Sequence, residues 1–147
     1  VPYIVGLGKA AELAKIDLAS DEIERIKKLR DTLQEALLKL PDARLNGSLT
    51  KRLPNTLNIS FEFIEGEALL YHLSDAGICA SSGSACSSGS LEPSHVIRAM
   101  GVPFTAVHGS LRFSLSRYNT EEDINQVIKV MPGIVDKLRK ISPFVNA

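Results

Sequence analysis

Cys86 is the residue whose surroundings most clearly suggest chemistry. It lies in SSGSACSSG, residues 81–89, and all the remaining residues of this segment are serine, glycine or alanine. Such residues leave the backbone free to move and cannot build a core. A thiol outside any burial pattern is a liability unless its reactivity is used. The segment therefore predicts a mobile loop carrying a nucleophile, Cys86, together with Ser82, Gly83, Ser84, Ala85, Ser87, Ser88 and Gly89.

The neighbours of the two cysteines predict different roles for them. Cys86 is either a nucleophile on a mobile loop or a loop cysteine without a function. A fixed Cys–His pair has no support, because no histidine is adjacent to Cys86. Cys79 instead follows Ile78 in a short apolar stretch. Cysteine is among the most often buried residue types, so we expect Cys79 to pack in the core.

Arg112 is the second candidate for chemistry. In LRFSLS, residues 111–116, apolar side chains alternate with Arg112 and with serine, as is typical of a strand with one buried face. A guanidinium fixed on the polar face can hold a carboxylate through two parallel hydrogen bonds. The alternative to a carboxylate-binding role is that Arg112 forms an ion pair with an acidic side chain at the surface.

The composition narrows the classes of partner. The chain has 147 residues with 17 basic and 17 acidic side chains, so its net charge gives no reason to expect nucleic acid or an anionic membrane. No apolar run reaches membrane-spanning length. Two cysteines are too few for a disulfide framework, and their spacing does not fit a usual zinc site, so no metal is expected. A reducing cytoplasm is the simplest location.

Hydrophobic periodicity predicts the elements that position these residues. The expected strands are residues 55–63, 78–80 and 111–116, and the expected helices are residues 1–14, 21–40, 66–76, 92–100 and 121–138. Thr120 and Asp123 should form a capping box, and Pro132 should kink or break the last helix. The predicted fold class is α+β, with a small mixed or antiparallel sheet and long helices packed on one face. We expect residues 1–20 to be the tail of a helix from a preceding domain, and residues 21–147 to form a small C-terminal domain with its mobile cysteine loop near 81–90.

The segment SSGSACSSGSLEPSHVIRAMG, residues 81–101, resembles the active-site loop and following helix of cysteine desulfurases of the NifS/IscS type. The stretches PNTLNISFEFIEGEALLYHLSDAGICA and HGSLRFSLSRYNTEEDI are similar to the flanking segments of the same family. The resemblance covers essentially the whole chain, and the loop motif is its most specific part.

This resemblance implies the small domain of a homodimeric class-V aminotransferase that depends on pyridoxal phosphate (PLP) and has the aspartate-aminotransferase fold. Such enzymes take sulfur from L-cysteine, leave L-alanine, and pass the sulfur to scaffold or other acceptor proteins for iron–sulfur cluster assembly. Cys86 matches the cysteine that becomes a persulfide, and Arg112 matches the arginine that holds the substrate carboxylate.

The chain also departs from the family pattern. The family's PLP lysine follows a histidine, whereas His72, His95 and His108 precede leucine, valine and glycine. The resemblance therefore places the cofactor-binding residues upstream of this chain, and we expect the chain alone to bind PLP poorly and to be inactive. The alternative is a stand-alone persulfide carrier or docking module without PLP chemistry. The resemblance favours L-cysteine as the substrate and leaves selenocysteine as an alternative.

Overall fold

An antiparallel sheet lies at the centre of the computed structural model, which describes residues 1–82 and 93–143. Its strands are β1 (Ala43–Leu45), β2 (Thr56–Phe61), β3 (Ser81–Ser82) and β4 (Ser110–Ser114), in the spatial order β1-β2-β4-β3. Strands β2 and β4 confirm the strands predicted at residues 55–63 and 111–116. The strand predicted at residues 78–80 is wrong, because the chain joins the sheet only at Ser81.

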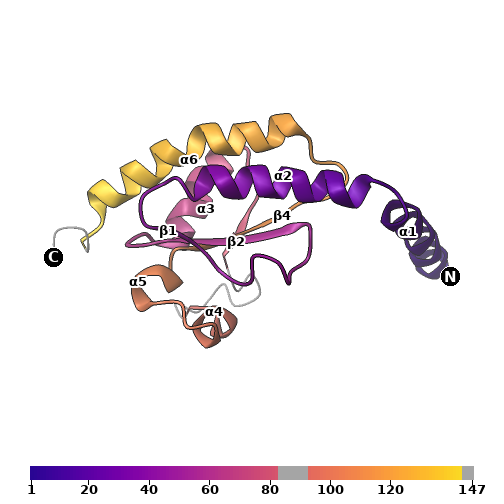
Figure 1. Ribbon diagram of the computed structural model, residues 1–147, viewed down its shortest axis with the longest axis horizontal. Helices are drawn as coiled ribbons and strands as arrows, with labels where there is room; N and C mark the ends of the chain where they lie inside the picture. The colour runs from indigo at the N-terminus through magenta and orange to yellow at the C-terminus, as the bar shows by residue number, and fades with distance from the viewer. Residues whose placement is uncertain (83–92, 144–147) are drawn as a thin grey trace.

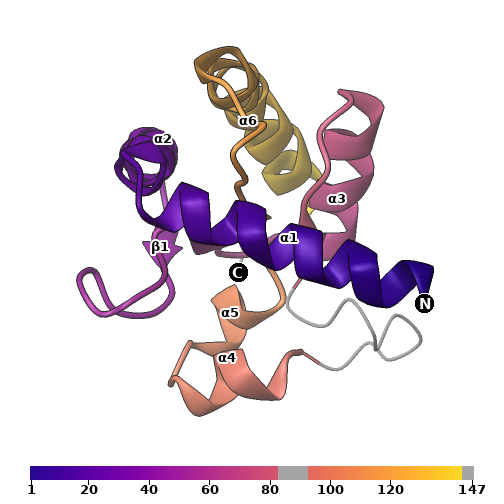
Figure 2. The same ribbon diagram turned by 90° about the vertical axis from the view of Figure 1, so that its right-hand side faces the viewer.

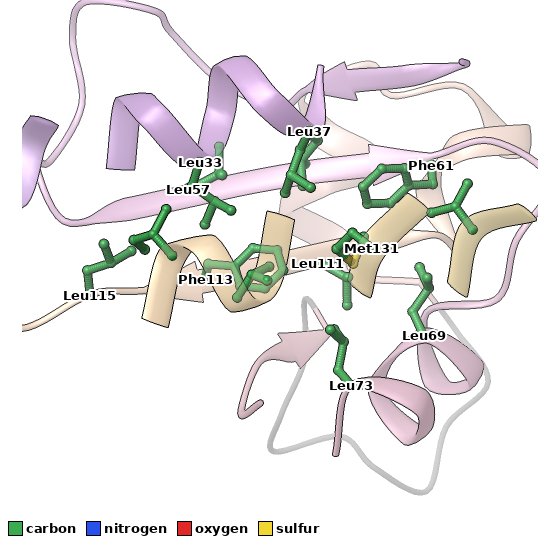
Figure 3. Close-up of a cluster of buried hydrophobic side chains, with 14 of the residues drawn as sticks. Leu33, Leu37, Leu57, Phe61, Leu69, Leu73, Leu111, Phe113, Leu115 and Met131 are labelled. Atoms are coloured by element: carbon green, nitrogen blue, oxygen red, sulfur yellow. The ribbon is translucent and has the colours of Figure 1, made fainter. Parts of the chain in front are cut away.

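Three helices cover one face of this sheet, as predicted (Figure 1). They are α2 (Glu22–Leu37), α3 (Gly66–Asp75) and α6 (Glu121–Ile141), and Figure 2 shows them together above the sheet. The inward side chains of β2 and β4 meet apolar side chains from all three helices (Figure 3). Burying each large apolar side chain contributes about 1.5–3 kcal/mol. The core therefore fixes the sheet's other face as the polar one. The labelled core residues are Leu33, Leu37, Leu57, Phe61, Leu69, Leu73, Leu111, Phe113, Leu115 and Met131.

Helix α6 begins at a capping box and continues past a proline. The Thr120 hydroxyl accepts a hydrogen bond from the Asp123 backbone N–H, and the Asp123 carboxylate accepts one from the Thr120 N–H, which confirms the capping box. The predicted break at Pro132 is wrong, since the helix runs through it to Ile141. Pro132 is exposed, so water can satisfy the carbonyl that its ring leaves without an N–H donor.

Helix α1 (Pro2–Leu18) extends away from the sheet, and none of its residues is buried (Figure 1). An ion pair of 2.9 Å joins its Asp17 to Arg117. The loop after it uses Ser20, whose hydroxyl accepts a hydrogen bond from the Glu22 N–H at 3.2 Å. The division of the chain near residue 20 stays a prediction.

Two short helices lie on the opposite side of the sheet from α2 and α6 (Figures 1 and 2). They are α4 (His95–Ala99) and α5 (Phe104–Val107), the second of which the sequence pattern did not predict. They share a small core of their own, formed by Ile97, Val102, Ala106 and Val107. Within the described residues, no helix is long and apolar enough to cross a membrane.

Candidate functional site

Arg112 is the middle residue of β4, on the face of the sheet away from the long helices. Leu111 and Phe113 on either side of it are buried in the core, so alternation along the strand turns Arg112 to the other face. There it is half-buried. Its neighbours across the sheet are Asn58 on β2 and Ser81 on β3. This row of polar residues is the candidate site.

No ion pair or hydrogen bond to a described residue engages the Arg112 side chain. Other arginines of the chain are held by carboxylates, for example Arg25 by Glu22 at 2.6 Å and Arg117 by Asp17 at 2.9 Å. The surface ion pair that the sequence left open is thus not formed within the described part of the chain. An arginine without a carboxylate partner is available to bind an anionic ligand.

Cys86 and its neighbours Gly83, Ser84, Ala85, Ser87, Ser88 and Gly89 lie outside the described residues. The described chain enters that segment through β3, where Ser81 pairs with Arg112 and Ser82 pairs with Leu111. Four residue steps separate Ser82 from Cys86, a reach of at most about 14 Å. The segment that contains the cysteine therefore starts on the strand next to Arg112. Its predicted mobility and the role of Cys86 stay predictions.

Cys79 corrects an expectation from the sequence. The prediction that it packs in the core is wrong, because its side chain is exposed. Ile78 is the residue of this pair that packs against the core. The two residues lie between the end of α3 and the start of β3, in chain that belongs to neither, so no helical or strand periodicity fixes which side chain faces inward. Sequence alone could not tell which of the two faces inward.

Arg25 fixes the connection that follows β4. Its guanidinium donates hydrogen bonds to the backbone carbonyls of Arg117 at 2.9 Å and Asn119 at 2.8 Å. The same group binds the Glu22 carboxylate, and this hydrogen bond holds the pKa of Glu22 below its ordinary value and raises the pKa of Arg25. The Glu22–Arg25 spacing is the only trace of this arrangement in the sequence, since the carbonyls are supplied by a distant segment.

Sequence reasoning missed a group of polar residues beside Arg112. Asn46, just after β1, is almost fully buried, and its amide nitrogen donates to the Asn58 side-chain oxygen and to the Ser60 hydroxyl, each at 2.7 Å. Asn58 and Ser60 alternate along β2 with side chains that point into the core, but only the strand pairing brings Asn46 to them.

The histidines do not gather at this site. His72 lies in α3, His95 in α4 and His108 just after α5. His108 stacks edge-on against Phe104, with ring centroids 5.0 Å apart. Where the structure describes the chain, no group of three His, Cys, Asp or Glu residues could hold a metal ion.

Comparison with known proteins decides the family. Residues 1–127 match the family model described as aminotransferase class-V. The chain belongs to this family. A "NifS-like protein" from Rickettsia africae, solved by X-ray crystallography, superposes with a TM-score of 0.78 at 34% identity, covering 90% of this chain and 34% of the other. The α+β architecture predicted from the sequence is therefore confirmed.

The family members that resemble this chain include proteins named as cysteine desulfurases. One, from Nostoc sp., is 62% identical over 147 residues, which cover 99% of this chain and 36% of the relative. Cysteine desulfurase NifS from Azotobacter vinelandii is 56% identical over 142 residues, covering 96% of this chain and 35% of the relative. The chain of this class-V aminotransferase thus spans about a third of the length of the curated relatives that it matches.

Proposed function

We propose that this chain is the sulfur-accepting part of a cysteine desulfurase that takes sulfur from L-cysteine for iron–sulfur cluster assembly. The observation that carries the proposal is the register of β3 and β4. It places an arginine with no carboxylate partner among the described residues beside the strand that leads to Cys86. The identity to proteins named cysteine desulfurase supports the same reaction.

Each of the two residues has a defined task in this reaction. Arg112 binds the carboxylate of L-cysteine through its two parallel N–H groups. The Cys86 thiolate attacks the sulfur of the substrate, so that a sulfur–sulfur bond forms as the carbon–sulfur bond breaks. The electron pair of the broken bond stays on the substrate carbon, which takes up a proton and becomes L-alanine. Cys86 is left as a persulfide, the form in which sulfur is passed on.

Pyridoxal phosphate, the cofactor of this family, supplies the electron sink for breaking the carbon–sulfur bond. It is carried on a lysine, so the lysines test whether this chain fits it. They lie in α1, α2 and α6, in the turn after α2 and in the β1–β2 loop, and none lies in the strands that carry the polar row around Arg112. The described residues do not by themselves fit the cofactor, and we place its lysine in a longer protein of the relatives' length.

The remaining assignments follow from the same proposal. The persulfide is delivered to an iron–sulfur scaffold or another sulfur-acceptor protein. The full-length protein is a homodimer in the cytoplasm. The 147 residues by themselves are inactive without the cofactor-binding part.

The test is to find which cysteine gains sulfur. The full-length, cofactor-loaded protein is mixed with L-cysteine, the products are alkylated and digested, and the peptides are analysed by mass spectrometry alongside L-alanine release. We expect one added sulfur atom on the peptide containing Cys86, and we expect Cys86→Ser to abolish both this adduct and sulfur transfer.

Cys79→Ser is the matched control, because Cys79 is an exposed cysteine of the same chain. It should leave the Cys86 adduct and alanine release unchanged. Sulfur on Cys79 instead, or an unchanged yield in Cys86→Ser, contradicts the proposal. If the 147-residue chain accepts sulfur from a sulfane-sulfur donor but the longer protein releases no alanine, the chain is a persulfide carrier.

A further inference from the structure

Asn58 lies directly opposite Arg112 on the polar face of the sheet. The backbone hydrogen bonds on either side are Leu115 N to Asn55 O at 2.8 Å and Phe61 N to Gly109 O at 3.0 Å. Hydrogen-bonded and non-hydrogen-bonded pairs alternate along an antiparallel ladder. Counting from either bond, Asn58 and Arg112 form a non-hydrogen-bonded pair, the kind in which the two side chains are closer together.

The orientation of the Asn58 amide is set by a buried neighbour. The Asn46 amide nitrogen donates to the Asn58 side-chain oxygen at 2.7 Å and uses its other hydrogen on the Ser60 hydroxyl at 2.7 Å. Ser60 is fully buried and Asn46 is 8% exposed, so neither can easily shift. With its oxygen held toward Asn46, Asn58 turns its own NH₂ group away from Asn46.

That NH₂ group has no acceptor among the described residues. Asn58 is half-buried, so its two donors are partly removed from water and have no partner in the described part of the chain. Leaving a half-buried donor unpaired costs free energy. A ligand that brings an acceptor to the polar face beside Arg112 removes this cost.

We propose that Asn58 is a second carboxylate-binding residue, whose amide donates a hydrogen bond to the same substrate carboxylate that Arg112 holds. This inference rests on the proposed function and names a specificity-determining residue of its site. A carboxylate has about four acceptor positions, and a bidentate guanidinium leaves some of them free. Asn58 supplies a neutral donor for one of these, so the site selects α-amino acids with a free carboxylate.

The experiment is isothermal titration calorimetry, in which L-alanine is titrated into the full-length, cofactor-loaded protein and the Kd is measured. L-Alanine carries the carboxylate but no sulfur, so the titration measures binding and not sulfur transfer. Asn58→Ala should raise the Kd for L-alanine about tenfold, as expected for the loss of one hydrogen bond to a charged group. Asn58→Asp should raise it further, because it places a second negative charge beside the ligand.

Thr56→Ala is the matched control, since Thr56 lies on the same strand and face, two residues away, and pairs with Ser114. The Kd of the Thr56→Ala variant for L-alanine should equal that of the unmodified protein. Each variant is first checked for an unchanged circular dichroism spectrum at the titration temperature, because Asn58→Ala also removes the acceptor of the buried Asn46 amide and should lower the thermal midpoint. If Asn58→Asp does not fold, Asn58→Ser replaces it and should weaken binding as Asn58→Ala does.

Arg112→Ala separates failure of this inference from failure of the proposed function. If Arg112→Ala weakens L-alanine binding and the Asn58 variants stay within twofold of the unmodified protein, the role of Asn58 is overturned and the proposed function stands. If neither residue affects binding, the carboxylate site itself is wrong, and the proposed function falls with it.

Discussion

Ser81 and Arg112 lie opposite each other where β3 pairs with β4. Because β3 is an edge strand of two residues, it does little to extend the sheet. Its position instead brings the start of the cysteine-containing segment next to the one strand that carries Arg112. A thiol that must reach a bound substrate benefits from an anchor close to the group that binds that substrate.

Arg112→Lys should raise the KM for L-cysteine in the full-length protein about tenfold, with a smaller effect on the thermal midpoint. Lysine keeps the charge but loses the planar fork that binds a carboxylate through two hydrogen bonds. Steady-state release of L-alanine measures the change.

Arg44→Lys is the control for that measurement, because Arg44 lies on the same face of the sheet on the outer strand β1. It should leave the KM unchanged. An equal rise in KM for the two substitutions would mean that the guanidinium of Arg112 has no specific role in binding the substrate.

Cys79→Ala should change the free energy of unfolding by no more than about 0.5 kcal/mol, as is usual for an exposed residue. The reason is the exposure of Cys79, which reverses the expectation from its apolar sequence neighbours. Leu73→Ala is the comparison, since Leu73 is fully buried and its truncation should cost about 2–5 kcal/mol. Urea denaturation followed by circular dichroism gives both values. A loss of more than about 1 kcal/mol for Cys79→Ala would show that the thiol packs in solution.

The Glu22–Arg25 pair should make a small part of the stability depend on pH in the acid range. Its hydrogen bond lowers the pKa of Glu22 below the ordinary value of 4.5. A lowered carboxyl pKa contributes stability that is complete above the unfolded pKa and is lost as the pH falls through the folded pKa. The difference in thermal midpoint between the unmodified protein and Glu22→Gln should therefore be largest at neutral pH and vanish in acid.

Glu35→Gln serves as the reference for this pH series. Glu35 is an exposed residue of the same helix and has no ion-pair partner within the described chain. Glu35→Gln should leave the thermal midpoint at neutral pH close to that of the unmodified protein, because it removes no ion pair. A Glu22→Gln difference that grows as the pH falls would contradict a stabilising role for the ionised Glu22 carboxylate.

The sequence by itself determined the parts of this protein that depend on neighbours along the chain. Alternation predicted β2 and β4, helical spacing predicted the long helices, and the Thr120–Asp123 spacing predicted a cap that the structure contains. These signals work because each one is satisfied within a few residues. The unusual composition around Cys86 is also local, so it pointed to the motif without a structure.

Tertiary structure alone decided which residues meet. Asn46, Asn58, Arg112 and Ser81 come from four segments of the chain and form one polar row only because the strands pair in a particular register. The exposure of Cys79 and the burial of Asn46 were likewise invisible in the sequence. Strand pairing joins residues far apart in sequence, and a shift of one position would turn every side chain to the other face. The physical reason is that the apolar core selects the register, and the register then assembles the site.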